Sequence, residues 1–220
     1  MELKGKKVVF LGDSITDGHG TSAKEFTYWN QFGKRTGAIV SANGIGGTRI
    51  APQRVYIVER PWENRHFSSR VEELDPEADI VVVFGGTNDF GNGDAALGTI
   101  ADRTEDSFYG ACHVLVQKLY ERYPNGTIVL MTPLHRLSED ETLYNELGVR
   151  RVGPLSAYVQ ALRDVAEFYG LPLVDLFANC PIQPRMELQR EKYMPDGLHP
   201  NDAGAELVAQ CLQTVLEGLR

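Results

Sequence analysis

Short runs of apolar, mostly β-branched residues alternate along this chain with longer stretches whose apolar residues recur every three or four positions. A short run without polar residues suits a strand buried on both faces, and the longer period suits a helix with one apolar face. The short runs predict strands at residues 7–11, 38–40, 79–84, 127–131 and 173–175. The longer stretches predict helices at residues 107–123, 154–169 and 201–219, and residues 28–34 and 66–74 are less regular helix candidates.

The alternation of strand and helix is typical of a doubly wound α/β fold, in which crossover helices join parallel strands and cover both faces of the sheet. We therefore predict a three-layer α/β/α domain with a parallel sheet of about five strands. No linker or internal repeat divides the chain, so residues 1–220 are predicted to form a single domain. The irregular stretches 44–65 and 132–153 are long for loops, and we expect them to build the wall of a substrate site.

Charge and composition exclude several classes of protein. Lys and Arg number 22 against 30 Asp and Glu, a net charge of −8, which argues against nucleic acid as a partner. Cys112, Cys180 and Cys211 form no CxxC pair, which favours buried thiols over a disulfide framework or a zinc site. The apolar run at residues 8–11 is too short for a signal peptide or a membrane-inserted segment. We expect a cytoplasmic protein, although a chain whose leader had been removed would read the same way.

A candidate nucleophile follows the first predicted strand, in the sequence Gly12-Asp13-Ser14. Ligands of open parallel sheets bind at the carboxyl ends of the strands, and Ser14 is expected at such an end. The alternative is that Ser14 only caps a following helical turn, with Asp17 three residues further on.

A candidate base and its partner occur together before the last predicted helix, in the segment 196–200, Asp-Gly-Leu-His-Pro. A serine hydroxyl is a weak nucleophile and needs a base, and the base needs a partner that stabilises its charged form. Asp196 and His199 are three residues apart and fall on the same side of one tight turn. The alternative is an ordinary turn followed by a surface histidine.

Two glycine-rich segments follow other predicted strands: Gly-Ile-Gly-Gly-Thr at 44–48 and Gly-Gly-Thr-Asn-Asp at 85–89. Acyl transfer develops an oxyanion that needs fixed donors, such as a glycine N–H or the side-chain amide of Asn88. Either segment alone would more often be a simple turn. All the motif segments are expected at one edge of the sheet, however, and this coincidence favours a common site.

In this order and spacing, the segments resemble the motif blocks of the SGNH (GDSL-type) hydrolase superfamily, and the resemblance covers almost the whole chain. It implies a flavodoxin-like sheet in the order 2-1-3-4-5, whose first and third strands flank the binding crevice. It implies Ser14 as the nucleophile, His199 as general base and then acid, and Asp196 as the carboxylate that orients His199.

The same resemblance implies an oxyanion hole made by the backbone N–H of Ser14, the N–H of Gly47 and the side-chain amide of Asn88. Gly46 is the alternative glycine, because the two are adjacent. Asp13 is expected to organise the turn instead of reacting.

The remaining candidates concern substrate and metal binding. Arg49 and Trp62 belong to a loop that mixes arginines with aromatic residues, which predicts a substrate rim able to stack a sugar ring or hold an anion. The alternative is a packed surface loop. The other histidines lack metal-ligand spacing and are expected to be structural or superficial, and neither a metal nor a cofactor is required. They are His19, His66, His113 and His135.

The sequence predicts a serine esterase that hydrolyses a small-acyl ester, with O-acetylated carbohydrates among the candidate substrates. A lysophospholipase or thioesterase acting on longer acyl chains is the first alternative, and a non-catalytic α/β binding module is the second. No oligomeric state is predicted. Apolar residues at 181–194 are expected either to pack on the domain or to meet another subunit.

Overall fold

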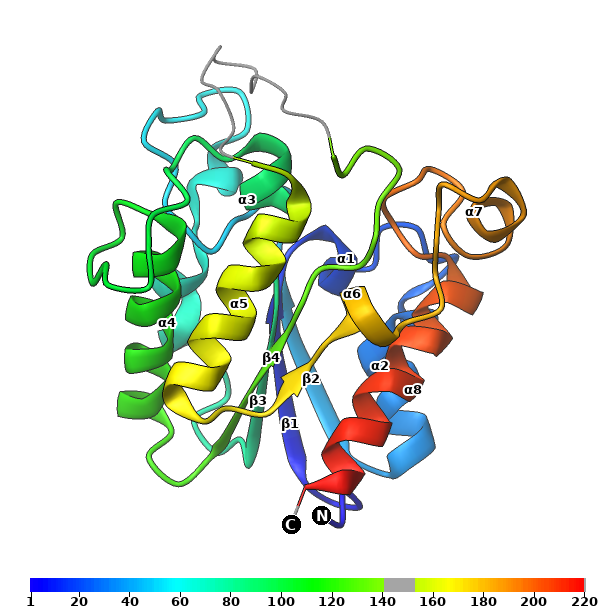
Figure 1. Cartoon of the computed structure of the whole chain (residues 1–220). Helices are drawn as coiled ribbons and strands as arrows, with labels where there is room; N and C mark the ends of the chain where they lie inside the picture. Colours follow the sequence, from blue (N-terminus) through cyan, green and yellow to red (C-terminus); the bar gives the residue numbers. More distant parts are fainter. Residues whose placement is uncertain (141–152, 220) are drawn as a thin grey trace.

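The computed structural model describes residues 1–140 and 153–219, which surround a central sheet (Figure 1). In this part of the chain the sheet has five strands: β1 (Lys7–Gly12), β2 (Ile39–Gly44), β3 (Ile80–Phe84), β4 (Thr127–Met131) and β5 (Leu173–Val174). All neighbouring strands are parallel, in the order β2-β1-β3-β4-β5. The predicted three-layer α/β/α fold and its strand order are confirmed.

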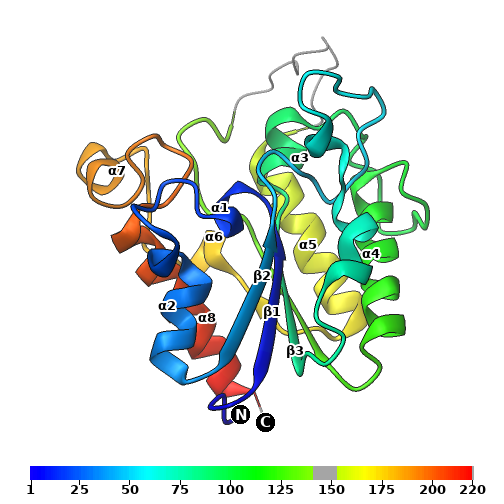
Figure 2. The same ribbon diagram turned by 180° about the vertical axis from the view of Figure 1, so that it is seen from behind.

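The longer helices cover both faces of the sheet. The helices α2 (Tyr28–Thr36) and α8 (Asp202–Gly218) lie on one face, and α4 (Phe108–Arg122) and α5 (Leu155–Tyr169) lie on the other (Figure 1 and Figure 2). Successive side chains of a strand point to opposite faces. Accordingly, Val9 and Leu11 of β1 join the core beneath α4 and α5, whereas Phe10 joins the core beneath α2 and α8.

The strand predictions agree with the structure within one residue at each end, except at β2. This strand continues to Gly44 because residues 41–44 pair in register with residues 9–12 of β1. It lies at the edge of the sheet, and only one of its faces packs against the core. Ile39 is 60% exposed, so the expectation that this strand is buried on both faces is wrong.

The helix predictions hold for α4, α5 and α8, and Asn201 caps α8 by accepting hydrogen bonds from the N–H groups of Ala203 and Gly204. Of the less regular candidates, residues 28–34 belong to α2, whereas 66–74 forms the 3₁₀ helix η3 (Phe67–Glu73). Tyr120 of α4 and Phe168 of α5 are apolar but exposed. Phe168 packs at the end of α5 against the rings of His113 and Tyr169.

The sequence does not predict the short helices at loop positions, because each has too few residues to show a helical period. They are α1 (Ser14–Asp17), η1 (Lys24–Phe26), η2 (Pro61–Asn64), α3 (Thr87–Asn92), α6 (Leu176–Asn179) and α7 (Glu187–Tyr193). Two of them, α1 and α3, carry motif residues.

The three cysteines are free thiols; Cys112 and Cys180 are buried and Cys211 is half-buried. Among the described residues, no helix combines the length and apolar character needed to cross a membrane. In the segment 181–194, Ile182 packs in the core, whereas Met186 and Leu188 are exposed.

The two irregular stretches follow the carboxyl ends of β2 and β4. The stretch 44–65 runs above the sheet edge and includes η2 (Figure 2). Of the stretch 132–153, residues 132–140 and 153 are described, and the predicted wall at 141–152 lies outside the described residues.

Candidate active site

Ser14 begins α1, and a single residue, Asp13, separates it from the end of β1. The carboxylate of Asp13 caps this helix, because its Oδ1 accepts a hydrogen bond from the N–H of Ile15 at 3.0 Å. The reading of Ser14 as the cap is therefore wrong, and the expectation that Asp13 organises the turn is confirmed. The turn is tight: a Cβ at Gly12 would lie 2.0 Å from Oγ1 of Thr16, so glycine is required there.

The Ser14 hydroxyl is the first member of a hydrogen-bonded chain. Its Oγ lies 2.9 Å from Nε2 of His199, and Nδ1 of His199 lies 2.7 Å from Oδ2 of Asp196. An ionised carboxylate only accepts hydrogen bonds, so Nδ1 carries the proton and Nε2 is left to accept from the serine hydroxyl. This arrangement can remove the serine proton during attack on a carbonyl carbon.

Asp196 is held in its charged form. Partial burial alone would raise its pKa, but hydrogen bonds from the main chain and ring of His199 and from the N–H of Leu198 outweigh burial and lower it. Oδ1 of Asp196 accepts from the main-chain N–H of His199 at 2.7 Å and from that of Leu198 at 2.9 Å. The carboxylate therefore organises the turn and faces the imidazole at the same time.

The turn that carries Asp196 and His199 is anchored by a neighbouring loop. The N–H of Leu137 donates to the carbonyl of Gly197 at 2.8 Å. Gly197 has a φ of +76°, and a Cβ there would lie 2.6 Å from Cβ of Leu137. Glycine is required at 197 both by its conformation and by the lack of space. Gly197 lies between Asp196 and His199 in the sequence, so this contact bears on the position of both side chains.

Asn88 lies across the crevice from Ser14, in the first turn of α3 after β3. Its Nδ2 donates to the main-chain carbonyl of Thr48 at 3.0 Å, and the side chain is only 6% exposed. One amide hydrogen is thus used to fix the side chain. Asn88 also lines the cleft beside Ser14, where the second hydrogen can serve a substrate oxygen.

The predicted glycines follow β2 and line the same cleft. Gly47 has a φ of +78°, and a Cβ there would lie 2.4 Å from Cδ of Glu63, so only glycine fits. Gly46 lies beside the Ser14 side chain, because a Cβ on it would lie 3.8 Å from Cβ of Ser14. Both N–H groups remain candidates for the oxyanion hole, as expected from their adjacency.

The cleft has a volume of about 510 Å³ and contains Ser14, His199 and Asn88 in its lining. The predicted rim residue Trp62 also lines it and is 49% exposed. Arg49 does not reach the cleft. It is 2% exposed, and its Nη2 lies 3.4 Å from Oε2 of the buried Glu63, which requires a cation beside it.

The cleft also contains Arg60 and Asn92, which were not proposed as site residues from the sequence, and His19, which was expected to be structural or superficial. Arg60 belongs to the same arginine-rich loop as Arg49, and its Nη1 lies 2.9 Å from Oε1 of Glu63. His19 and Asn92 follow Ser14 and Asn88 by about one helical turn, and this spacing is the signal that could have found them. The ring centroid of His19 lies 5.5 Å from that of His199.

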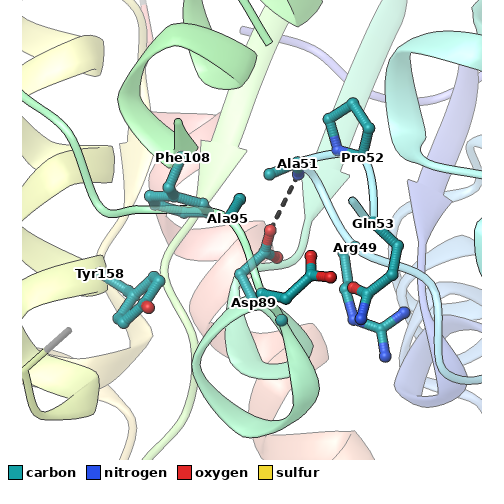
Figure 3. Close-up of a pocket in the computed structure, with 10 residues that line it drawn as sticks. Arg49, Ala51, Pro52, Gln53, Asp89, Ala95, Phe108 and Tyr158 are labelled. Carbon is teal, nitrogen blue, oxygen red and sulfur yellow. Dashed lines mark hydrogen bonds between the residues drawn. The ribbon is translucent and has the colours of Figure 1, made fainter. Parts of the chain in front are cut away.

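A second, small pocket is lined by Arg49 and by Asp89, whose carboxyl is buried (Figure 3). Asp89 accepts hydrogen bonds from the N–H of Ala51 at 2.8 Å and from that of Ile50 at 3.1 Å. These contacts tie α3 to the chain that follows the glycine segment. Burial raises the pKa of Asp89 to about 6 and that of Asp13 to about 7.

A serine, histidine and aspartate joined by hydrogen bonds at the carboxyl ends of a 2-1-3-4-5 sheet, opposite an asparagine and a glycine segment, define the SGNH class of hydrolase. The family model of the GDSL-like lipase/acylhydrolase family matches residues 10–207. The chain belongs to this family. It is a hydrolase of carboxylic esters, which overturns the alternative of a non-catalytic binding module.

Individual proteins show the same similarity. A GDSL lipase of Mycobacterium tuberculosis is 26% identical over 217 residues, which cover 95% of this chain and 80% of the relative. A crystal structure of a Lactobacillus plantarum protein is 28% identical, with a TM-score of 0.82 and 99% of each chain covered. A two-domain esterase active on acetylated mannans is 24% identical, with a TM-score of 0.62, over 97% of this chain and 49% of that chain.

Proposed function

We propose that this protein is a serine esterase that removes a small acyl group from a hydroxylated substrate, with Ser14 as nucleophile. The observation that carries the proposal is the chain of hydrogen bonds from Ser14 Oγ through His199 to Asp196, which opens into a cleft beside Asn88. The cytoplasmic location expected from the sequence is part of the proposal and is tested by cell fractionation.

The reaction proceeds in two steps. Oγ of Ser14 attacks the acyl carbon while Nε2 of His199 takes its proton, and the carbonyl oxygen becomes an oxyanion. His199 then gives the proton to the departing alcohol, which leaves an acyl-enzyme. A water molecule, deprotonated by His199, attacks the acyl carbon, and the carboxylic acid departs as Ser14 recovers its proton.

The oxyanion is stabilised by the N–H of Ser14, the N–H of Gly47 and the second amide hydrogen of Asn88. Fixed donors of this kind cost no reorganisation during the reaction and act strongly in a site with little water. The hydrogen bond from Asn88 to Thr48 supports this role, since it holds the amide in one orientation.

The lining of the cleft favours an acylated carbohydrate. Among the described lining residues, Ile45, Trp62 and Leu198 are the large apolar ones, and the others are mostly polar or glycine. A half-exposed indole stacks on the face of a sugar ring, and polar side chains such as Asn92 bind its hydroxyls. The activity of the two-domain relative on acetylated mannans supports this substrate class.

An esterase of longer acyl chains, a lysophospholipase or thioesterase, is the second candidate. The loop that leads to Trp62 exposes Val55 and Val58, at 47% and 73%. These side chains would extend an apolar track from the cleft for a longer chain.

Hydrolysis of p-nitrophenyl esters from acetate to octanoate, by the parent and Ser14→Ala proteins, tests the proposal. We expect activity that falls with chain length and that decreases by about 10³-fold or more in Ser14→Ala. Activity within a few-fold of the parent in Ser14→Ala would exclude Ser14 as nucleophile. A rate that rises toward octanoate would favour the second candidate. A rate that falls with chain length would make acetylated oligosaccharides the next substrates to test.

A further inference from the structure

Arg70 of η3 is a fully buried arginine beneath the proposed site, with 0% of its surface exposed. Its guanidinium donates four hydrogen bonds to oxygens of three separate segments. Nη1 donates to the carbonyl of Asn43 at 3.0 Å and to its side-chain Oδ1 at 2.8 Å. Nη2 donates to the carbonyl of Gly12 at 3.0 Å and to Oγ1 of Thr48 at 3.1 Å.

A buried cation is costly unless nearby groups stabilise it. No carboxylate of the described residues lies within 4.0 Å of Arg70, so neutral oxygens take the place of an ion-pair partner. Its Nε has no hydrogen-bond partner in the described part of the chain. An apolar residue of similar size would fill the space at less cost, so packing alone does not account for an arginine here.

The segments held by Arg70 are those that carry the proposed oxyanion donors. Gly12 lies two residues before Ser14, and Asn43 directly precedes the glycine segment 44–47. Thr48 directly follows that segment, and its carbonyl accepts the hydrogen bond from Asn88. The Ser14 turn, the glycine segment and Asn88 are therefore linked through one guanidinium, directly or by way of Thr48.

We propose that Arg70 is the positioning residue of the oxyanion hole, which it keeps in shape by fixing the ends of β1 and β2 and the Thr48 hydroxyl relative to one another. The inference rests on the proposed function, because it concerns the donors of that reaction. Arg70 lines none of the cleft and touches no reacting atom. It acts through the main-chain and side-chain groups that it binds.

The shape of the guanidinium explains why arginine is needed. Its planar fork reaches Asn43 with one nitrogen and Gly12 and Thr48 with the other, which fixes the distances between these segments. A lysine ammonium keeps the charge but is a single point at the end of a flexible chain, and it cannot bridge all three segments. Arg70→Lys therefore keeps the positive charge but removes the fork of the guanidinium, so its effect reports the contribution of the fork.

The experiment compares Arg70→Lys, Thr48→Val and Thr48→Ser with the parent protein. Thr48→Val removes the hydroxyl that accepts a hydrogen bond from Arg70, together with that hydroxyl's own hydrogen bond to the carbonyl of Ile45 at 2.7 Å, and leaves Arg70 with its other three hydrogen bonds. Thr48→Ser retains the hydroxyl and both contacts. Arg122→Lys is the matched control, because Arg122 also donates to main-chain carbonyls, those of Glu72 and Leu74, at the far end of η3. Each variant is assayed on p-nitrophenyl acetate, and its melting temperature is recorded.

A second readout reports the oxyanion directly. An aryl trifluoromethyl ketone forms a hemiketal with the nucleophilic serine. The oxyanion of this hemiketal occupies the oxyanion hole. We expect kcat of Arg70→Lys to fall about 10²-fold with KM within threefold, and affinity for the ketone to fall in parallel. Thr48→Val should lower kcat and affinity for the ketone about tenfold each, and Thr48→Ser should retain most of both. Arg122→Lys should lower the melting temperature and leave kcat and affinity for the ketone unchanged.

A merely structural role would lower the melting temperature of Arg70→Lys while kcat per folded molecule and ketone affinity stayed within threefold, and this would overturn the inference. If Arg70→Lys does not fold, Thr48→Val provides the test, and unchanged kcat and ketone affinity in that variant would overturn the inference equally.

Ser14→Ala distinguishes the two proposals. Retained activity in Ser14→Ala refutes the proposed function, whereas loss in Ser14→Ala with unchanged Arg70 and Thr48 variants refutes only the inference about Arg70.

Discussion

At the scale of single residues, the site combines a carboxyl group with a lowered pKa and two buried carboxyl groups with raised pKa values. Asp196 accepts several hydrogen bonds, and its pKa lies below the ordinary value. Asp13 and Asp89 are fully buried, and loss of hydration raises the pKa of each. The carboxylate that faces the imidazole is thus kept charged, while Asp13 and Asp89 take up protons as the pH falls through about 7 and about 6.

The raised pKa of Asp13 predicts a pH dependence of stability. Its pKa is about 7 in the folded protein against 3.8 ordinarily, so the folded state binds the proton more tightly. The stabilisation is complete below about pH 4 and is lost as the pH rises toward 7. Asp13→Asn keeps an oxygen for the N–H of Ile15 but removes the titration, and it should flatten the slope by up to about 1.4 kcal/mol per pH unit.

Urea denaturation between pH 4.5 and 7.5 measures this slope for both proteins. Asp89 titrates in the same direction and remains in the variant, so a residual slope of the same sign is expected. Equal slopes in the parent and in Asp13→Asn would contradict the assignment.

Asn88 yields a prediction about catalysis. Asn88→Ala removes one donor of the proposed oxyanion hole, and we expect kcat to fall about 10²–10³-fold with little change in KM. Steady-state kinetics on p-nitrophenyl acetate measure both constants, and circular dichroism checks that the variant is folded. A decrease of less than about threefold in kcat would remove Asn88 from this role.

At the scale of elements, turns and short helices carry the site, and glycines make them possible. Gly47 and Gly197 both have left-handed backbones in which an added Cβ would meet a neighbouring side chain. At Gly197 that neighbour is Leu137, whose N–H also binds the turn between Asp196 and His199. The position of the imidazole therefore depends on a loop more than fifty residues away in sequence.

Comparison of Gly197→Ala with Gly170→Ala tests this dependence. Both glycines have positive φ, but a Cβ at Gly170 would meet nothing within 4 Å. Gly170→Ala should cost about 1 kcal/mol of stability from backbone strain, with kcat unchanged. Gly197→Ala adds the collision with Leu137, and we expect kcat to fall at least tenfold as His199 moves. Thermal melting and ester kinetics measure the two effects, and equal kcat values in the two variants would refute the claim.

At the scale of the whole molecule, strand order brings the site together. The carboxyl ends of β1 and β3 are adjacent in the order β2-β1-β3-β4-β5, and the loops that follow them diverge to leave a crevice. The segment before α8 reaches the same edge and supplies Asp196 and His199. Substrate preference then depends on which loops border the cleft.

Trp62 tests the preference for a carbohydrate. Trp62→Ala removes a half-exposed indole from the cleft, and kcat/KM on an acetylated oligosaccharide should fall about three- to tenfold, while p-nitrophenyl acetate is unaffected. Phe168→Ala is the control, because this ring has similar exposure but lies at the end of α5. Equal kcat/KM on the oligosaccharide for the parent and Trp62→Ala would exclude the indole from substrate binding.

Most of the fold was predictable because its signals are local. The strands β1, β3 and β4 are uninterrupted apolar runs, and α4, α5 and α8 are long enough to show a helical period. Helices as short as α1 and α3 lack that signal. The burial of β2 could not be predicted either, since exposure of Ile39 follows from the edge position of its strand and not from its own composition.

The sequence by itself determined the fold class, the family and the residues proposed for the chemistry, because these depend on patterns and spacings within short segments. Tertiary structure alone decided which side chains reach the cleft. It buried Arg49 against Glu63, exposed Trp62, and placed Arg70 beneath the proposed oxyanion hole. Such outcomes depend on how distant segments pack and on where a buried charge finds its partners, and no local pattern records either.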